Sequence, residues 1–185
     1  MSTILWQAPG GTSLERCTFE PTAGGWRISG TVLLIAADQP HEIRYSVQTD
    51  PDWRTLTVGA HVQSPEGDRR VALRTDGDGA WSANDEPVVD LFGATDVDLS
   101  WTPATNTLPI RRLGLEVGER AEIIVAWIRF PEHEIERAAQ RYERVAADTY
   151  RYTAGEHTVD LSLDAFGRVL SYPDAWLAVA QTTPR

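Results

Sequence analysis

One polar segment carries the side chains best suited to hold a ligand. It contains two acids, Asp96 and Asp98, one amide, Asn106, and two adjacent guanidinium groups, Arg111 and Arg112. Carboxylate and amide groups form directional hydrogen bonds with hydroxyls, and Arg also binds phosphate with two parallel bonds. The segment therefore predicts a site for the polar part of a ligand that carries hydroxyls or phosphates.

Aromatic side chains could add flat surfaces to such a site. Trp53 follows the turn Asp50-Pro51-Asp52 and precedes Arg54, so we expect a partly exposed ring beside a hydrogen-bond donor. Trp127 lies in an apolar run and is a further candidate contact. Core packing is the simpler interpretation for at least four of the seven Trp residues, because most follow strand periodicity.

No residue pattern indicates a metal centre, a cofactor or a nucleophile. The four His residues are scattered, and His133-Glu134 lacks the second His of the HExxH zinc signature. We expect no cofactor, no metal and no enzymatic activity. One catalytic alternative stays open. Asp96 and Asp98 lie on the same face of a predicted strand, with their Cα atoms about 6–7 Å apart, and could flank a sugar bond as in a glycosidase.

The composition limits the partners of this chain. Its formal charge is -10, with 27 acidic residues, and all 17 basic residues are Arg. An acidic surface repels a phosphodiester backbone, so nucleic acid is not an expected partner. The absence of Lys excludes Schiff-base chemistry.

Apolar runs are short throughout the chain. Residues 32–37 and 123–128 are the longest, far below the roughly 20 residues that cross a bilayer. The N-terminal residues do not resemble a secretory signal, so we expect a cytoplasmic protein without membrane insertion. The lone Cys17 lies in an alternating run and is predicted to be a core residue.

Period-2 alternation predicts a mainly β protein that forms a single domain over residues 1–185. Asp and Gly residues predict hairpin turns at 76–79 and 164–167. The nearly continuous apolar run 121–131 is typical of a strand that is covered on both faces. Helical spacing over residues 133–147 favours an amphipathic helix when it is considered alone.

For the polar segment we predict two antiparallel strands, 96–101 and 111–117, joined by a loop centred on Asn106. In this register Leu99 lies opposite Leu113, Val97 opposite Leu115 and Ser100 opposite Arg112, while Asp98 lies diagonal to Arg112. The segment would then carry an acid and a guanidinium group beside a loop rich in hydroxyls. The alternative is that Asp98 and Arg112 form an ordinary ion pair, which contributes roughly 0–1 kcal/mol if it is exposed, and that no ligand binds there.

The order of motifs along the chain resembles the putative glycolipid-binding family, which has a spiral β-roll fold. The resemblance covers nearly the whole chain. Its central part is Asp96-Val97-Asp98-Leu99, Thr102-Pro103, residues 105–113, Ala126-Trp127-Ile128 and Pro131. Further motifs are Tyr45-Ser46-Val47, Asp52-Trp53-Arg54, Asp76-Gly77, Trp81, Arg141-Tyr142, Tyr150-Arg151-Tyr152, Gly167 and Tyr172-Pro173.

This resemblance implies a long antiparallel sheet wrapped around a single α-helix. It favours strands over residues 133–153 despite their helical spacing, and it leaves the helix to residues 173–180. The chain departs from the family pattern at Ala104 and at Asp174-Ala175-Trp176. Members are thought to dimerise and to bind or transport a glycolipid, so a homodimer is expected.

Three functions follow as hypotheses. The first is non-enzymatic binding or transport of a glycolipid or similar amphiphile, through Trp53, Arg54, Asp96, Asp98, Asn106, Arg111, Arg112 and Trp127. The second is a hydrolase that acts on a glycosylated or ester substrate. The third is a structural dimer module without a ligand.

Overall fold

A computed structural model describes residues 1–182 as a 15-stranded sheet with one α-helix in that range. The strands are β1 (Ser2–Gln7), β2 (Ser13–Thr22), β3 (Gly25–Ala36), β4 (Gln39–Thr49), β5 (Thr55–Gln63), β6 (Arg69–Thr75), β7 (Trp81–Ala83), β8 (Glu86–Pro87), β9 (Asp96–Leu99), β10 (Arg120–Ile128), β11 (Ile135–Ala146), β12 (Thr149–Ala154), β13 (His157–Leu163), β14 (Val169–Tyr172) and β15 (Trp176–Gln181). The helices are η1 (Pro9–Gly11), η2 (Val89–Leu91), η3 (Ala104–Asn106) and α1 (Thr107–Leu113). The predicted mainly β fold with one short helix is confirmed.

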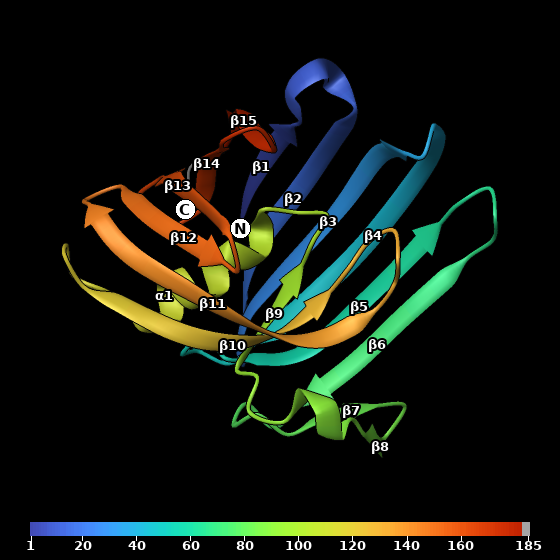
Figure 1. Cartoon of the computed structure of the whole chain (residues 1–185), viewed down its shortest axis with the longest axis horizontal. Helices are drawn as coiled ribbons and strands as arrows, with labels where there is room; N and C mark the ends of the chain where they lie inside the picture. Colours follow the sequence, from blue (N-terminus) through green and yellow to red (C-terminus); the bar gives the residue numbers. More distant parts are fainter. Residues whose placement is uncertain (183–185) are drawn as a thin grey trace.

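The two strands nearest the chain ends lie in the middle of the sheet. From one edge of the sheet to the other, the strands run from β8 down to β1 and then from β15 down to β9. β1 therefore pairs with β15. All pairs are antiparallel except β9 with β10, which is parallel. The sheet curls so that α1 lies inside the roll, between the N-terminal and C-terminal halves (Figure 1).

β10 is packed on both faces, as its apolar run predicted. Ala126 and Ile128 belong to the core of the N-terminal half, whereas Ile123 and Val125 belong to the core of the C-terminal half. Alternate residues of a strand point to opposite faces, so only a strand between two cores is apolar at nearly every position. The same two cores meet at α1.

Three turns share the same pattern of hydrogen bonds to an Asp carboxylate. In each, one Asp Oδ1 accepts hydrogen bonds from the backbone N–H groups two and four residues later, at 2.8–3.0 Å. The three residues are Asp50, Asp76 and Asp164. Asp side chains commonly close turns in this way. The hairpins predicted at 76–79 and 164–167 are confirmed, by the β6–β7 and β13–β14 pairs.

The predicted antiparallel pair around Asn106 is wrong. Residues 104–113 form η3 and α1, and β9 pairs in parallel with β10 instead. The Thr102 hydroxyl accepts a hydrogen bond from the N–H of Ala104, the first residue of η3, at 3.0 Å. Gly114 ends α1 in the left-handed conformation, with its N–H donating to the Ile110 carbonyl at 3.3 Å. Gly suits this C-terminal position because it has no Cβ.

The helix predicted at residues 173–180 is also wrong, because the stretch forms a turn and then β15. A short segment gains more from pairing with both β1 and β14 than from its local helix-start signals. The strands expected between residues 133 and 153 are confirmed as β11 and β12. In that region, sheet pairing overrides the helical spacing.

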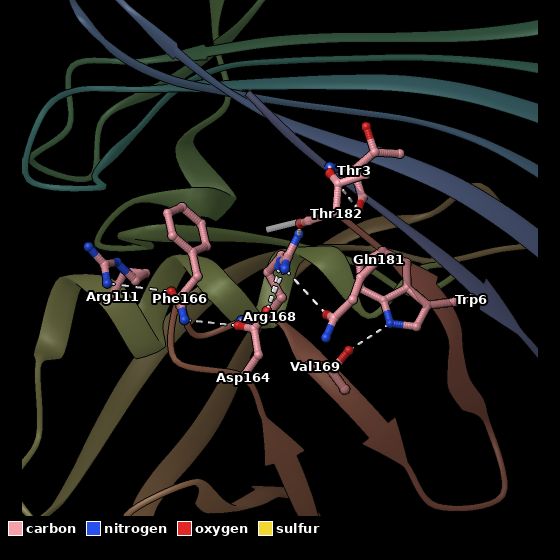
Figure 2. Close-up of polar contacts among 9 residues, drawn as sticks. All are labelled: Thr3, Trp6, Arg111, Asp164, Phe166, Arg168, Val169, Gln181 and Thr182. Atoms are coloured by element: carbon pink, nitrogen blue, oxygen red, sulfur yellow. Dashed lines mark hydrogen bonds and ion pairs between the residues drawn. The ribbon is translucent and has the colours of Figure 1, made fainter. Parts of the chain in front are cut away.

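A buried Arg joins the last strands to the start of the chain (Figure 2). Arg168 is 1% exposed and contacts Asp164 at 2.6 Å. It also donates to the side chain of Gln181 at 3.3 Å and to the backbone carbonyl of Thr182 at 3.2 Å. Thr182 in turn hydrogen-bonds the backbone of Thr3 at 2.8 Å. Sequence analysis did not identify this arrangement.

Gly30 is required by the ring of Tyr45. A Cβ at residue 30 would lie 2.4 Å from the Tyr45 ring, whereas a Cβ at Gly59 would meet nothing within 4 Å. Overpacking a core typically costs about 1–3 kcal/mol. We expect Gly30→Ala to lower the free energy of unfolding by that amount, measured by urea denaturation, and Gly59→Ala to leave it unchanged or raise it. Equal effects at both sites would contradict this prediction.

Candidate functional site

A cavity of about 730 Å³ lies against the C-terminal half of the sheet, bounded by β9, the segment 100–106 and strands β10–β15. This volume is within the range of small-molecule sites. Its aromatic wall contains Trp127, Tyr172 and Trp176, and its polar residues include Asp98 and Gln140. Three of the predicted site residues line it: Asp98, Asn106 and Trp127.

The parallel pairing of β9 and β10 sets the position of Asp98. Asp98 is in register with Trp127, so both side chains lie on the same face of the sheet. The Asp98 carboxyl accepts hydrogen bonds from the Gln140 amide at 2.5 Å and from the Thr105 hydroxyl at 3.4 Å. Its orientation is therefore held by β11 and η3.

Burial changes the proton affinity of these polar groups. It raises the pKa of Asp98 above its ordinary value, although hydrogen bonds from Gln140 and Thr105 act in the opposite direction. The pKa values of Tyr152 and Tyr172 are also raised, first by burial and then by the charge of Asp98. Both hydroxyls therefore stay protonated and able to donate hydrogen bonds at neutral pH.

Asn106 has a structural role at the cavity wall. Its side-chain oxygen accepts the Tyr142 hydroxyl at 2.8 Å, and its amide donates to the Pro103 carbonyl at 3.2 Å. These bonds tie the start of α1 to β11. Asn106 thus shapes the cavity while its own polar groups are already engaged within the protein.

Arg112 does not meet Asp98, contrary to the predicted register. It forms a two-pronged ion pair with Asp96, at 2.6 and 3.1 Å, and Asp96 is fully buried. Arg112 and Thr95 line an adjoining cavity of about 570 Å³, which shares Gln140 with the first one. The helical turn of α1 carries Arg112 back toward the start of β9, which a strand at 111–117 would not do.

Trp53, Arg54 and Arg111 lie outside the 730 Å³ cavity. Trp53 is 4% exposed and stacks on Trp26 with ring centroids 5.0 Å apart, so the expected exposed ring is wrong. The Arg111 guanidinium lies over the Trp53 ring, 5.2 Å from its centroid. Arg54 is exposed and 3.6 Å from Asp78. The structure therefore brings Arg111 and Trp53 together, but as a packing contact.

Several lining residues were missed by sequence reasoning. His157 and Tyr172 meet at the cavity rim, with the His Nε2 2.9 Å from the Tyr hydroxyl oxygen. Gln140, Tyr152 and Trp176 also line the cavity. The motifs Tyr150-Arg151-Tyr152 and Tyr172-Pro173 were a usable signal, because both matched the family pattern without an assigned role.

Residues 1–182 contain neither a candidate metal site nor a candidate membrane-spanning helix. In that range no three or more His, Cys, Asp or Glu side chains group as a metal site would require. Nor do residues 1–182 include a helix with the length and apolar character of a membrane span.

Comparison with known proteins places the chain in a family. A DUF1089-family protein from Pseudomonas aeruginosa, solved by crystallography, is similar over 93% of this chain and 94% of its own, with 31% identity and a TM-score of 0.83. No curated protein matches significantly. The profile of the family described as putative glycolipid-binding matches residues 3–178. This chain therefore belongs to the putative glycolipid-binding family.

Proposed function

We propose that this protein binds a glycolipid or similar amphiphile, without catalysis, in the cavity between Asp98 and Trp176. The observation that carries the proposal is the division of the cavity wall into apolar and polar parts. Ala138 and Trp127 offer partly exposed surface for an acyl chain, while Asp98 is among the groups available to a hydroxylated head. Ligand sites commonly combine a mostly apolar wall with a few oriented polar groups. The family description supports the same ligand class.

The geometry gives less support to the glycosidase alternative. That mechanism requires two carboxyl groups on either side of the sugar bond. Of the predicted pair, Asp98 lines the cavity, but Asp96 is fully buried and engaged by Arg112. The other acid that lines the cavity, Asp174, is exposed in the turn before β15. The proposed role is binding or transfer of an intact ligand.

Filling the cavity tests this proposal. We expect Ala138→Trp to weaken binding of n-decyl β-D-glucoside at least tenfold, because Ala138 lines the cavity and is only partly buried. Binding is measured by isothermal titration calorimetry below the micelle concentration, and the melting temperature of each variant is recorded. Ala72→Trp is the matched control, because Ala72 is exposed on β6, away from this cavity.

The wild-type protein and the Ala72→Trp control should bind the glucoside equally. Mass spectrometry of an organic extract of the purified protein should also detect a co-purified amphiphile. Undiminished binding by a folded Ala138→Trp variant would contradict the assigned site. Absence of binding by the wild-type protein across neutral and charged amphiphiles would contradict the function.

A further inference from the structure

We propose that the polar end of this cavity selects an uncharged, hydroxyl-rich head group and disfavours an anionic one. The inference rests on the proposed binding function and specifies the chemical class of its ligand. It replaces the sequence-based expectation that Arg111 and Arg112 would contact phosphates. Three observations support it.

The first observation is the charge of the cavity lining. Among the described residues that line it, Asp98 and Asp174 are acids and no Arg is present. His157 is the one lining side chain that could carry a positive charge, and its Nε2 is already engaged with the Tyr172 hydroxyl at 2.9 Å. An anionic head group would therefore lie beside carboxyl groups without a free cation to offset the repulsion.

The second observation concerns the guanidinium groups behind the wall. Arg112 is paired with the buried Asp96 at 2.6 Å. Arg129 lies over the ring of Trp127, 5.4 Å from its centroid, but three acids surround it. These are Glu132, Glu134 and Glu136, at 3.9, 3.1 and 3.2 Å. The charges of Arg112 and Arg129 are thus compensated within the protein.

The third observation is the match between the polar groups and a sugar hydroxyl. A hydroxyl donates one hydrogen bond and accepts others, so it needs acceptors and donors together. Asp98 supplies acceptor oxygens, and the Tyr172 hydroxyl, which shares a hydrogen bond with the His157 Nε2 at 2.9 Å, lies on the same cavity together with Tyr152. An anion needs donors only, and burying it beside Asp98 would carry an uncompensated desolvation cost.

A matched ligand pair tests the inference. n-Decyl β-D-glucoside and n-decyl β-D-glucuronide share one chain and one ring and differ in a hydroxymethyl group against a carboxylate. We expect the wild-type protein to bind the glucoside at least tenfold more tightly at pH 7.5, measured by isothermal titration calorimetry. n-Decyltrimethylammonium serves as the cationic ligand in the comparison, and we expect it to bind more weakly than the glucoside.

Removal of the cavity acids should reduce this discrimination. We expect Asp98→Asn with Asp174→Asn to lower the glucoside-to-glucuronide affinity ratio at least threefold. Asp85→Asn with Asp90→Asn is the control, because both acids are exposed and it removes the same net charge away from the cavity. Asp85 also matches Asp174 in its positive φ, 66° against 60°. Asp174→Asn alone provides a variant at an exposed lining residue that leaves the hydrogen bonds of Asp98 with Gln140 and Thr105 intact.

The outcomes separate the inference from the function. Equal or tighter binding of the glucuronide or of the ammonium ligand would overturn the inference and leave amphiphile binding in place. A ratio that changes equally in the control and the cavity variants would also overturn it, because the effect would then come from net charge. Failure of all three ligands to bind would overturn both proposals.

Discussion

The protein should lose stability as pH rises from about 5 to 8, because Glu15 is fully buried. Its Oε1 accepts hydrogen bonds from the Tyr45 hydroxyl at 2.5 Å and the Thr102 hydroxyl at 2.8 Å, while its Oε2 has no partner. Burial raises the pKa of Glu15 from its ordinary value of 4.5 to about 8, although both hydrogen bonds act in the opposite direction. The native protein therefore keeps this proton at neutral pH.

The direction of the effect follows from proton linkage. Below pH 4.5 both native and unfolded states hold the proton, so the full stability is present. Between pH 4.5 and about 8 the unfolded chain releases the proton and the native state retains it, so stability falls with pH. At about 1.4 kcal/mol per pKa unit, the loss is on the order of 4–5 kcal/mol across this window.

Glu15→Gln should abolish this component, because an amide does not titrate. We expect the unfolding free energy of the wild type to fall by about 4 kcal/mol relative to that of the variant from pH 5 to pH 8, measured by urea denaturation. Glu20→Gln on the same strand is the control, since Glu20 pairs with Arg27 at a half-exposed site. Parallel pH profiles for wild type and Glu15→Gln would show that the carboxyl is ionised in the native state.

Arg112→Ala should lower the free energy of unfolding by about 3–5 kcal/mol, because it leaves the buried Asp96 without a partner. The ion pair is short, at 2.6 Å, and Arg112 itself is only 18% exposed at the side chain. Arg151→Ala is the matched control. Its pair with Asp160 is nearly half exposed, and such pairs contribute about 0–1 kcal/mol.

Replacement of both partners separates lost pairing from lost packing. We expect Asp96→Leu with Arg112→Met to recover most of the stability that Arg112→Ala loses, because no buried charge is then left unpaired. Both variants are compared by urea denaturation. A cost below about 1 kcal/mol for Arg112→Ala would show that Asp96 is solvated.

The sequence analysis selected three residues that the structure places on the wall of the candidate cavity. Asp98, Asn106 and Trp127 were selected and do line one cavity. Arg111 and Trp53 were also selected, but they meet in a packing contact outside it. Polar residues in one segment can point to different cavities once the backbone becomes helical, and composition does not record this difference.

Local chemistry alone determined the mainly β fold, the Asp-closed turns and the doubly buried strand β10. Each of these has a signal within a short segment, such as Asp76 and the backbone N–H groups of residues 78 and 80 from which it accepts hydrogen bonds. The positions of the helix and of β15 were decided only by the tertiary structure. β15 is a strand because β1, more than 160 residues away, offers hydrogen-bond partners. The cavity likewise exists because parallel pairing of β9 with β10 brings Asp98 beside Trp127.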